Sequence, residues 1–234
     1  MNNYKIGVLG GLGPLATAVF LERVIDLTNS KCDQDNVDMI ILNHSSVPDR
    51  TDYLLDNNYP NPLPYLINDA RILENIGVEY IALPCNTAHA FYDEISNSIN
   101  IKIINMVSDT IEECTSKNFK KVGLMATRGT INTKVFDKYN TCLDLFIPSE
   151  EIQKKVDYFI FDKVKKNIDV SENEFNEVLN YFKENNCDGI ILGCTELSVI
   201  NKKLKIKDKR IIDTLDVLAK KVILLDNKKI QEGE

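Results

Sequence analysis

Two cysteines occupy matching positions in a repeated motif, in which an apolar stretch runs into a cysteine and then into polar residues able to begin a helix. The first copy spans residues 78–87 and contains Cys85, and the second spans residues 187–196 and contains Cys194. The two cysteines lie 109 residues apart (194 − 85). Two thiols on opposite sides of one substrate suit a reaction that removes a proton from one face of a carbon and returns a proton to the other face.

The placement of both cysteines at the carboxyl ends of expected strands bears on the ionisation of the thiols. At that edge of an open α/β sheet the strands meet helix N-termini, where ligands bind and where the pKa of a thiol is lowered. We therefore expect Cys85 and Cys194 to exchange the roles of thiolate base and thiol acid. The remaining cysteines lack this placement, and we assign them no function; they are Cys32, Cys114, Cys142 and Cys187.

A hydrolase built on a Cys/His pair is the weaker alternative, because the chain has two histidines, His44 and His89. His89 lies four residues after Cys85, and we expect it to pack or to cap rather than to ionise. His44 ends an expected strand, and a minor contact with a ligand stays open.

The repeat extends beyond the cysteines. Lys5–Leu9 matches Lys121–Met125, and residues 102–105 match residues 210–213. Matches in the same order along the chain indicate two similar halves. The 234 residues suffice for two small domains, which we place at 1–106 plus 208–234 and at 107–207.

Apolar runs alternate with helical patterns along the whole chain, which predicts an α/β fold. We expect two pseudo-symmetric domains, each a parallel sheet with helices on both faces, and an active site in the cleft between them. The predicted strands are Lys5–Leu9, Val37–Leu42, Tyr80–Leu83, Ile101–Asn105, Val122–Met125, Leu143–Ile147, Gly189–Leu192 and Arg210–Ile212. The predicted helices are Pro14–Asn29, Asp69–Ile76, Glu94–Ile99, Val107–Cys114, Glu151–Lys166, Glu172–Asn185 and Leu215–Asp226. We expect Asp109 and Ser171 to be N-caps, and the irregular segment 49–64 to be functional.

The glycine-rich segment 10–16 matches a dinucleotide-binding fingerprint formally, but the expected second strand lacks the acidic residue that the fingerprint needs. We interpret the segment, including Leu12 and Gly13, as a loop whose backbone N–H groups approach a small carboxylate. The equivalent loop of the second half, with Thr127, offers hydroxyl and N–H groups for the same purpose. Arg50 can bind a carboxylate through its paired fork, although a surface role for this arginine stays open.

Composition limits the possible partners. The net charge of −7 argues against a nucleic-acid or anionic-membrane partner, and no apolar run approaches the length of a membrane span. The cysteines show no zinc or iron–sulfur spacing, so no metal is expected. The first residues lead directly into an expected strand, so we expect no signal peptide and a reduced, cytoplasmic protein.

Four motifs together resemble the aspartate/glutamate racemase family, in particular its cofactor-independent aspartate racemase branch. They are Gly10–Pro14, Pro48–Thr51, Pro84–His89 and Gly193–Glu196. The resemblance implies an amino-acid racemase that uses no pyridoxal phosphate, in which Cys85 and Cys194 are the paired acid and base. It also implies two α/β domains and a homodimer.

The resemblance assigns substrate contacts as well. Arg50 looks like the residue that binds the side-chain carboxylate, and Lys165 like a second cationic contact. The full expected substrate-binding set is Leu12, Gly13, Arg50, Asn86, Thr87, Ala88, Thr127, Lys165 and Thr195. The glutamate racemase branch typically has Asp-Ser in the first glycine loop and His after the second Cys-Thr. This chain has neither, which favours aspartate. Glutamate, a broad set of amino acids, a related isomerase reaction and a non-catalytic small-anion binder stay open as alternatives.

Overall fold

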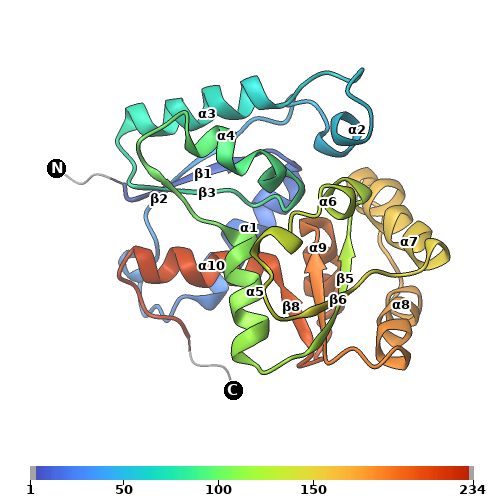
Figure 1. Ribbon diagram of the computed structural model, residues 1–234. Helices are drawn as coiled ribbons and strands as arrows, with labels where there is room; N and C mark the ends of the chain where they lie inside the picture. The colour runs from blue at the N-terminus through green and yellow to red at the C-terminus, as the bar shows by residue number, and fades with distance from the viewer. Residues whose placement is uncertain (1–3, 232–234) are drawn as a thin grey trace.

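Eight short strands form two separate parallel sheets with helices on both sides, as the computed structural model shows for residues 4–231 (Figure 1). The first sheet has the order β2-β1-β3-β4 and the second the order β6-β5-β7-β8. The strands are β1 (Ile6–Gly10), β2 (Met39–Asn43), β3 (Tyr80–Ala82), β4 (Lys102–Ile103), β5 (Lys121–Ala126), β6 (Asp144–Phe146), β7 (Gly189–Gly193) and β8 (Ile211–Asp213). Each predicted strand is confirmed to within two residues at either end.

The two sheets repeat one topology, which confirms the α/β fold with two similar halves. In both sheets the first strand of the half lies second in the order and pairs in parallel with strands on either side. Strand β8, which we expected with the N-terminal half, pairs with β7 instead, with Ile190 opposite Ile211. The domain division at 106/107 and 207/208 stays a prediction, and its residues 1–3 and 232–234 lie outside the described part of the chain.

Ten helices of the described chain connect and cover these strands. They are α1 (Pro14–Leu27), α2 (Arg50–Leu55), α3 (Leu63–Ile76), α4 (Tyr92–Ser96), α5 (Met106–Ser116), α6 (Arg128–Asn132), α7 (Glu150–Asp157), α8 (Glu172–Glu184), α9 (Thr195–Leu204) and α10 (Thr214–Leu225). In Figure 1, α3 and α4 lie over the first sheet and α7 and α8 flank the second. Helix α1 contacts both α9 and α10, so the two halves meet along these helices.

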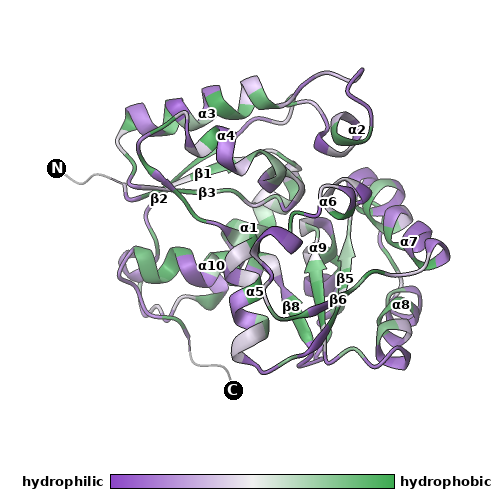
Figure 2. Ribbon diagram, viewed as in Figure 1, coloured by the Kyte–Doolittle hydropathy of each residue, from purple (hydrophilic) through white to green (hydrophobic). Residues whose placement is uncertain are grey.

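Burial on both faces explains why the strands are nearly continuous apolar runs. All residues of β1 and β7 are buried, as expected for parallel strands covered by helices on either side. One apolar cluster extends across both halves and includes Ile6, Phe20, Leu192 and Leu218. Figure 2 shows the same distribution, with apolar colouring on the strands of the second sheet and polar colouring on outward helix surfaces.

Helix capping agrees with the sequence at one site and differs at another. Ser171 begins α8 with a complete capping box, in which its side chain accepts from the Glu174 N–H and the Glu174 carboxylate accepts from the Ser171 N–H. Asp109, predicted as a cap, lies inside the first turn of α5, and Asn105 caps that helix by accepting from the Ser108 N–H. The expectation for Asp109 was wrong because Asn105 offers the same cap one turn earlier.

The segment that we expected as one helix over residues 151–166 changes its winding twice. The α-helix ends at Asp157, and a stretch of π-helix, Tyr158–Lys163, follows. A single 3₁₀ turn, Val164–Lys166, ends in Asn167, whose backbone is left-handed (φ 57°). Stretches of π-helix often occur at functional sites. Lys165 lies on the 3₁₀ turn that follows the π-helix rather than on a regular helix face.

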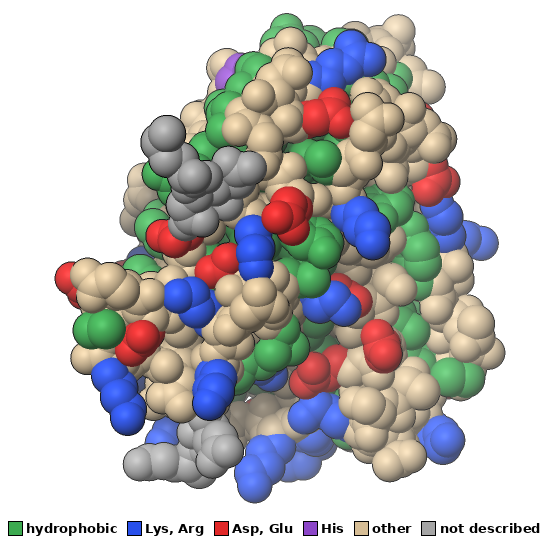
Figure 3. Space-filling view, turned by 90° about the vertical axis from the view of Figure 1, so that its left-hand side faces the viewer, with side chains coloured by type: hydrophobic (Ala, Val, Ile, Leu, Met, Phe, Trp, Pro, Cys, Tyr) green, Lys and Arg blue, Asp and Glu red, His purple; other side chains and the backbone are tan. Residues whose placement is uncertain are grey.

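The surface mixes charges of both signs. On the face shown in Figure 3, Lys and Arg side chains lie close to Asp and Glu side chains rather than gathering into one large patch. Across residues 4–231, no helix combines the length and the apolar character that crossing a membrane requires.

Candidate active site

A small cavity lies where Cys85 follows β3 and Cys194 follows β7. Its volume is about 20 Å³, enough for roughly one water molecule. Loops from both halves contribute to its wall. The lining residues are Leu12, Asp49, Arg50, Thr51, Cys85, Asn86, Thr87, Thr127, Ile160, Lys165, Cys194, Thr195 and Glu196. Cys85 and Cys194 therefore line one small cavity, as the two-thiol hypothesis requires.

His89 holds the loop that presents Cys85. The histidine is buried, its Nδ1 lies 2.9 Å from the carbonyl oxygen of Cys85, and its Nε2 accepts from the Met106 N–H at 3.2 Å. Because Nε2 accepts, the neutral ring donates from Nδ1 to the Cys85 carbonyl. Burial lowers the pKa of His89 to about 4, so the ring is neutral near pH 7. The predicted packing and capping role is confirmed.

The two thiols differ in their electrostatic surroundings. Burial raises the pKa of Cys85, while the Arg50 guanidinium and the Ala88 N–H oppose that rise. Burial also raises the pKa of Cys194, and here the nearby Glu196 carboxylate raises it further. The Cys194 thiol donates to Glu196 Oε2 at 2.9 Å. The expectation of lowered pKa values was wrong, because removal from water outweighs the helix N-termini in the closed site.

Arg50 is buried rather than on the surface, with 7% of its area exposed. Its guanidinium donates from Nη2 to the Leu12 carbonyl at 2.7 Å and from Nη1 to the Pro48 carbonyl at 3.1 Å. Its Nε is buried and has no hydrogen-bond partner among the described residues. A buried guanidinium with a free donor is poised to bind an anion.

Asn86 offers a free acceptor on the same cavity. Its Nδ2 donates to the Thr214 hydroxyl at 2.8 Å, which fixes the orientation of the amide. Within residues 4–231, its buried Oδ1 has no hydrogen-bond partner. The cavity residues thus include an unused donor on Arg50 and an unused acceptor on Asn86, and buried polar atoms of this kind call for a ligand or a water.

Lys165 and Asp49 form an ion pair across the two halves, with 2.7 Å between Nζ and Oδ2. Burial works against the charge of Asp49, but the Lys165 charge and hydrogen bond prevail and lower the pKa of the carboxyl. Burial likewise works against the Lys165 ammonium, whose pKa is nevertheless raised by Asp49 and Glu196. Both groups therefore stay charged near neutral pH.

Three threonine hydroxyls join the loops that follow β3 and β5. The Oγ1 atoms of Thr87 and Thr127 lie 3.0 Å apart, as do those of Thr87 and Thr130, and those of Thr127 and Thr130 lie 3.1 Å apart. Thr127 also caps α6 by accepting from the Thr130 N–H. The hydroxyl of Thr127 is thus engaged in holding the loops together.

A second cavity of about 270 Å³ adjoins the first and shares four lining residues with it, Asp49, Arg50, Lys165 and Glu196. Gly13 lines this second cavity rather than the first. Of the other predicted site residues, Ala88 is buried and lines neither cavity, whereas the rest line the first.

Four residues of the first cavity were absent from the predicted set, namely Asp49, Thr51, Ile160 and Glu196. Glu196 carried a recognisable signal, since a carboxylate two residues after Cys194 lies in the same first helical turn.

His44 lines neither cavity and its Nδ1 lies 2.8 Å from Asp69 Oδ2, so the open possibility of a ligand contact gains no support. Over the described part of the chain, no group of three or more His, Cys, Asp and Glu residues is arranged to hold a metal ion.

Each of the two parallel α/β halves contributes one cysteine, Cys85 or Cys194, to a shared cavity, and two similar α/β halves of this kind define a class of two-sheet folds. The chain belongs to the Asp/Glu/Hydantoin racemase family, whose match covers residues 9–222.

Solved structures share the fold over almost the entire chain. The Picrophilus torridus aspartate racemase superposes with a TM-score of 0.81 and 30% sequence identity, covering 97% of this chain and 96% of that one. Glutamate racemase from Francisella tularensis, solved in complex with D-glutamate, has a TM-score of 0.61 and 22% identity, covering 96% and 81% of the two chains. At that lower identity the likeness shows the fold alone.

Curated relatives match over shorter segments. The broad specificity amino-acid racemase RacX of Bacillus subtilis (strain 168) is 34% identical over 137 residues, which cover 57% of this chain and 59% of RacX. The matched segments span 59% to 63% of the lengths of RacX and of three glutamate racemases.

Proposed function

We propose that this protein is a cofactor-independent amino-acid racemase whose substrate is aspartate. The observation that carries the proposal is that Cys85 and Cys194 line one buried cavity from equivalent strand ends of the two halves. Family membership supports the reaction class, and the Picrophilus neighbour supports aspartate.

In the proposed reaction one cysteine acts as thiolate and takes the α-proton of the bound amino acid, so that the C–H electron pair stays on Cα. The thiol of the other cysteine then delivers its proton to the opposite face of Cα and becomes a thiolate. The configuration is inverted, and the pair of sulfurs has gained and lost one proton. The reverse reaction runs with the roles of Cys85 and Cys194 exchanged.

The polar groups of the cavity match a dicarboxylic amino acid. The free Nε of Arg50 and the Lys165 ammonium supply two positions for carboxylates, and the free Oδ1 of Asn86 can accept from the α-ammonium. An ammonium held near the thiols also favours the thiolate form and so offsets the effect of burial on the thiol pKa values. The ammonium group and the two carboxylates of aspartate can therefore each pair with a cavity group of opposite polarity.

Substrate binding requires the site to open. A cavity of about 20 Å³ is far smaller than aspartate, so the loops that close it must move apart. The Asp49–Lys165 ion pair lies between the small cavity and the larger one beside it, and the substrate carboxylate would replace Asp49 as the partner of Lys165. The interdomain cleft, the homodimer and the cytoplasmic location remain predictions that belong with this function.

Two measurements test the proposal, both on purified protein to which no pyridoxal phosphate has been added. Circular dichroism should show the signal of L-aspartate and of D-aspartate each decaying to zero. Proton NMR in D₂O should show exchange of the α-proton. A protein that binds aspartate without any exchange would be a binding protein and would contradict the proposal.

Broad specificity is the second candidate, favoured by the 34% identity to RacX and by the adjoining cavity of about 270 Å³. With the ion pair open, that space could take side chains longer than that of aspartate. Comparison of kcat/KM for aspartate, glutamate, alanine and lysine distinguishes the two candidates. Values within about tenfold of one another would favour broad specificity.

A further inference from the structure

An aliphatic cavity of about 290 Å³ lies outside the two cavities that share Arg50 and Lys165 as lining residues. It is formed between helix α9 and the segment 164–170, with Leu15 from the start of α1. Most of its wall is hydrocarbon, supplied by Leu15, Ile168, Val170, Val199, Ile200 and Leu204. Concave, mainly apolar spaces with a few polar groups are the usual form of small-molecule sites.

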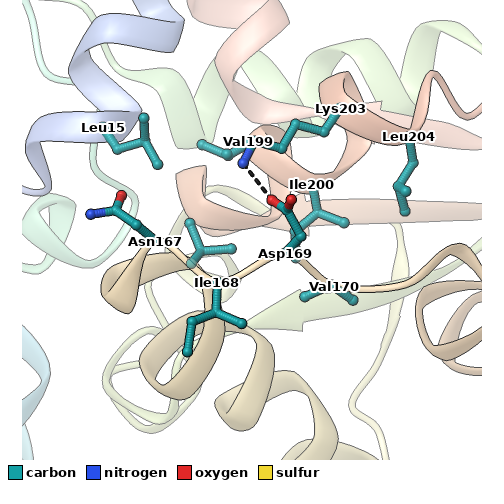
Figure 4. Close-up of a pocket in the computed structure, with 10 residues that line it drawn as sticks. Leu15, Asn167, Ile168, Asp169, Val170, Val199, Ile200, Lys203 and Leu204 are labelled. Carbon is teal, nitrogen blue, oxygen red and sulfur yellow. Dashed lines mark hydrogen bonds and ion pairs between the residues drawn. The ribbon is translucent and has the colours of Figure 1, made fainter.

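The polar groups of this cavity are one positive and one negative charge side by side. Lys203 Nζ lies 2.6 Å from Asp169 Oδ1, and Figure 4 shows the two side chains meeting within the ring of aliphatic side chains. The two side chains remain 54% and 77% exposed, respectively. Exposed ion pairs contribute little to stability, so a ligand with charges of both signs can replace each partner with a small loss.

We propose that this cavity binds an aliphatic α-amino acid as its zwitterion and that occupancy restrains the segment carrying Lys165. The α-carboxylate pairs with Lys203, the α-ammonium pairs with Asp169, and the branched side chain lies against Leu15 and Val199. A ligand with only one charged group leaves either the lysine or the aspartate without its new partner. An amino acid without an aliphatic side chain leaves the hydrocarbon wall uncovered.

The expected restraint of Lys165 follows from residues that line both this cavity and the cavity beside the candidate active site. Leu15, Val164 and Asn167 line both this cavity and the 270 Å³ cavity beside the candidate active site. Lys165 lies between two of those residues, on a turn held by hydrogen bonds from the Asn167 N–H to the Val164 carbonyl and from the Ile168 N–H to the Lys163 carbonyl. A ligand packed against Val164 and Asn167 holds this turn in place and keeps Lys165 on Asp49. This part of the inference rests on the proposed function, whereas binding itself does not.

Calorimetric titration with L-leucine tests the binding site. Wild-type protein should bind leucine with saturable heat, and 4-methylpentanoate, which lacks the ammonium group, should bind about twofold to fivefold more weakly, as expected for the loss of one exposed ion pair. Lys203→Met should weaken leucine binding by about the same factor, and Ile168→Trp should abolish it by placing an indole in the cavity that Ile168 lines. Lys155→Met, which removes a comparable ion pair between Lys155 on α7 and Glu177 on α8, is the matched control and should bind as wild type. Absence of binding, or equal binding by all four proteins, would overturn the proposal.

Photo-leucine separates this site from the candidate active site. Irradiation followed by peptide mass spectrometry should place the label in residues 164–170 and 195–204. A label confined to the peptides that contain Arg50 or Cys85 would mean that leucine occupies the active cavity, and would overturn the proposal.

Kinetics with aspartate test the restraint. Saturating leucine should raise the KM for aspartate at least threefold in wild type and leave it unchanged in Ile168→Trp. An unchanged KM in wild type with leucine bound would overturn the restraint. Absence of any racemisation would instead reject the proposed function, and the calorimetry and the photo-leucine label would still decide the binding site.

Discussion

The Cys194 thiol donates a hydrogen bond to the buried carboxylate of Glu196, with 2.9 Å between Sγ and Oε2. Cys85, by contrast, lies beside the positive charge of Arg50, which lowers its pKa against the effect of burial. The two sulfurs are therefore unequal before substrate arrives. Cys194 therefore retains its thiol proton more strongly, and Cys85 ionises more readily.

Replacing Glu196 with glutamine should lower the pKa of Cys194. The carboxylate disfavours a neighbouring thiolate through its charge and stabilises the thiol as a hydrogen-bond acceptor, and glutamine removes the charge while keeping the shape. The midpoint of iodoacetamide alkylation at Cys194, followed by mass spectrometry, should move down by about one pH unit or more. Glu172→Gln, on the exposed start of α8, should leave the midpoint unchanged. An unmoved midpoint in Glu196→Gln would show that the hydrogen bond does not govern this thiol.

The pH profile of racemisation should have its acidic limb above pH 7. One thiolate is needed for proton removal, and the pKa values of both thiols are raised by burial. The fraction of protein carrying a thiolate therefore grows as the pH rises through the alkaline range. Measured values of kcat/KM for aspartate should increase between pH 6 and pH 9. A flat profile over that range would mean that a group other than these cysteines supplies the base.

Serine substitutions should distinguish the two cysteines, each of which is proposed to act on one face of the substrate Cα. Either Cys85→Ser or Cys194→Ser should lower racemisation by about a hundredfold or more, the usual loss for an acid–base group. Each variant keeps one thiol, so each should still exchange the α-proton of one enantiomer of aspartate for deuterium. The two variants should favour opposite enantiomers in proton NMR. Cys114→Ser, in the core of α5, is the control for a buried thiol away from the cavity.

Replacing Lys165 with methionine should raise the KM for aspartate about tenfold or more. In the proposed binding mode Lys165 pairs with the side-chain carboxylate and Arg50 with the α-carboxylate, which differs from the role that the family resemblance implies for Arg50. The charged hydrogen bond from Lys165 contributes about 1.5 to 3 kcal/mol. Alanine, which has no side-chain carboxylate, should be affected much less. Lys166→Met removes the neighbouring ion pair with Asp162 and is the matched control. Equal effects on aspartate and alanine would assign Lys165 a general structural role.

Replacing Gly11 with alanine should destabilise the fold more than replacing Gly77. Both glycines have a left-handed backbone, with φ of 89° and 95°, so both substitutions carry the strain of that conformation. A Cβ at Gly11 would also lie 2.4 Å from the backbone nitrogen of His44, whereas a Cβ at Gly77 meets nothing within 4 Å. We expect a loss of about 1 kcal/mol for Gly77→Ala and about 2 kcal/mol or more for Gly11→Ala in urea unfolding. Equal losses would mean that the loop around Gly11 relaxes freely.

Features encoded in neighbouring residues could be predicted from the sequence. The strands that carry both cysteines are buried on two faces, so their apolar runs are nearly uninterrupted and locate Cys85 and Cys194 at strand ends. The capping box of Ser171 depends on residues three positions apart and is equally visible. The pairing of β8 with β7 could not be predicted from the sequence, because strand order within a sheet is decided by contacts between residues distant in sequence.

Features that depend on burial could not be predicted from the sequence. The thiol pKa values are raised because the closed loops exclude water, and no residue adjacent to Cys85 signals that closure. The sequence left Arg50 between a surface role and a site role for the same reason, because its burial depends on contacts such as the one with the Leu12 carbonyl, 38 residues away in sequence. The short helix α2 was hidden by the prolines and asparagines that follow it, although Asp49 caps it in the ordinary way.

The ring of Thr87, Thr127 and Thr130 has a consequence for motion. Each hydroxyl can both donate and accept, so the direction of donation around the ring can reverse while every side chain keeps its neighbours. The ring therefore joins the two loops without a charge and without a fixed direction of donation. We expect the ring to hold these loops together when the site opens at the Asp49–Lys165 ion pair.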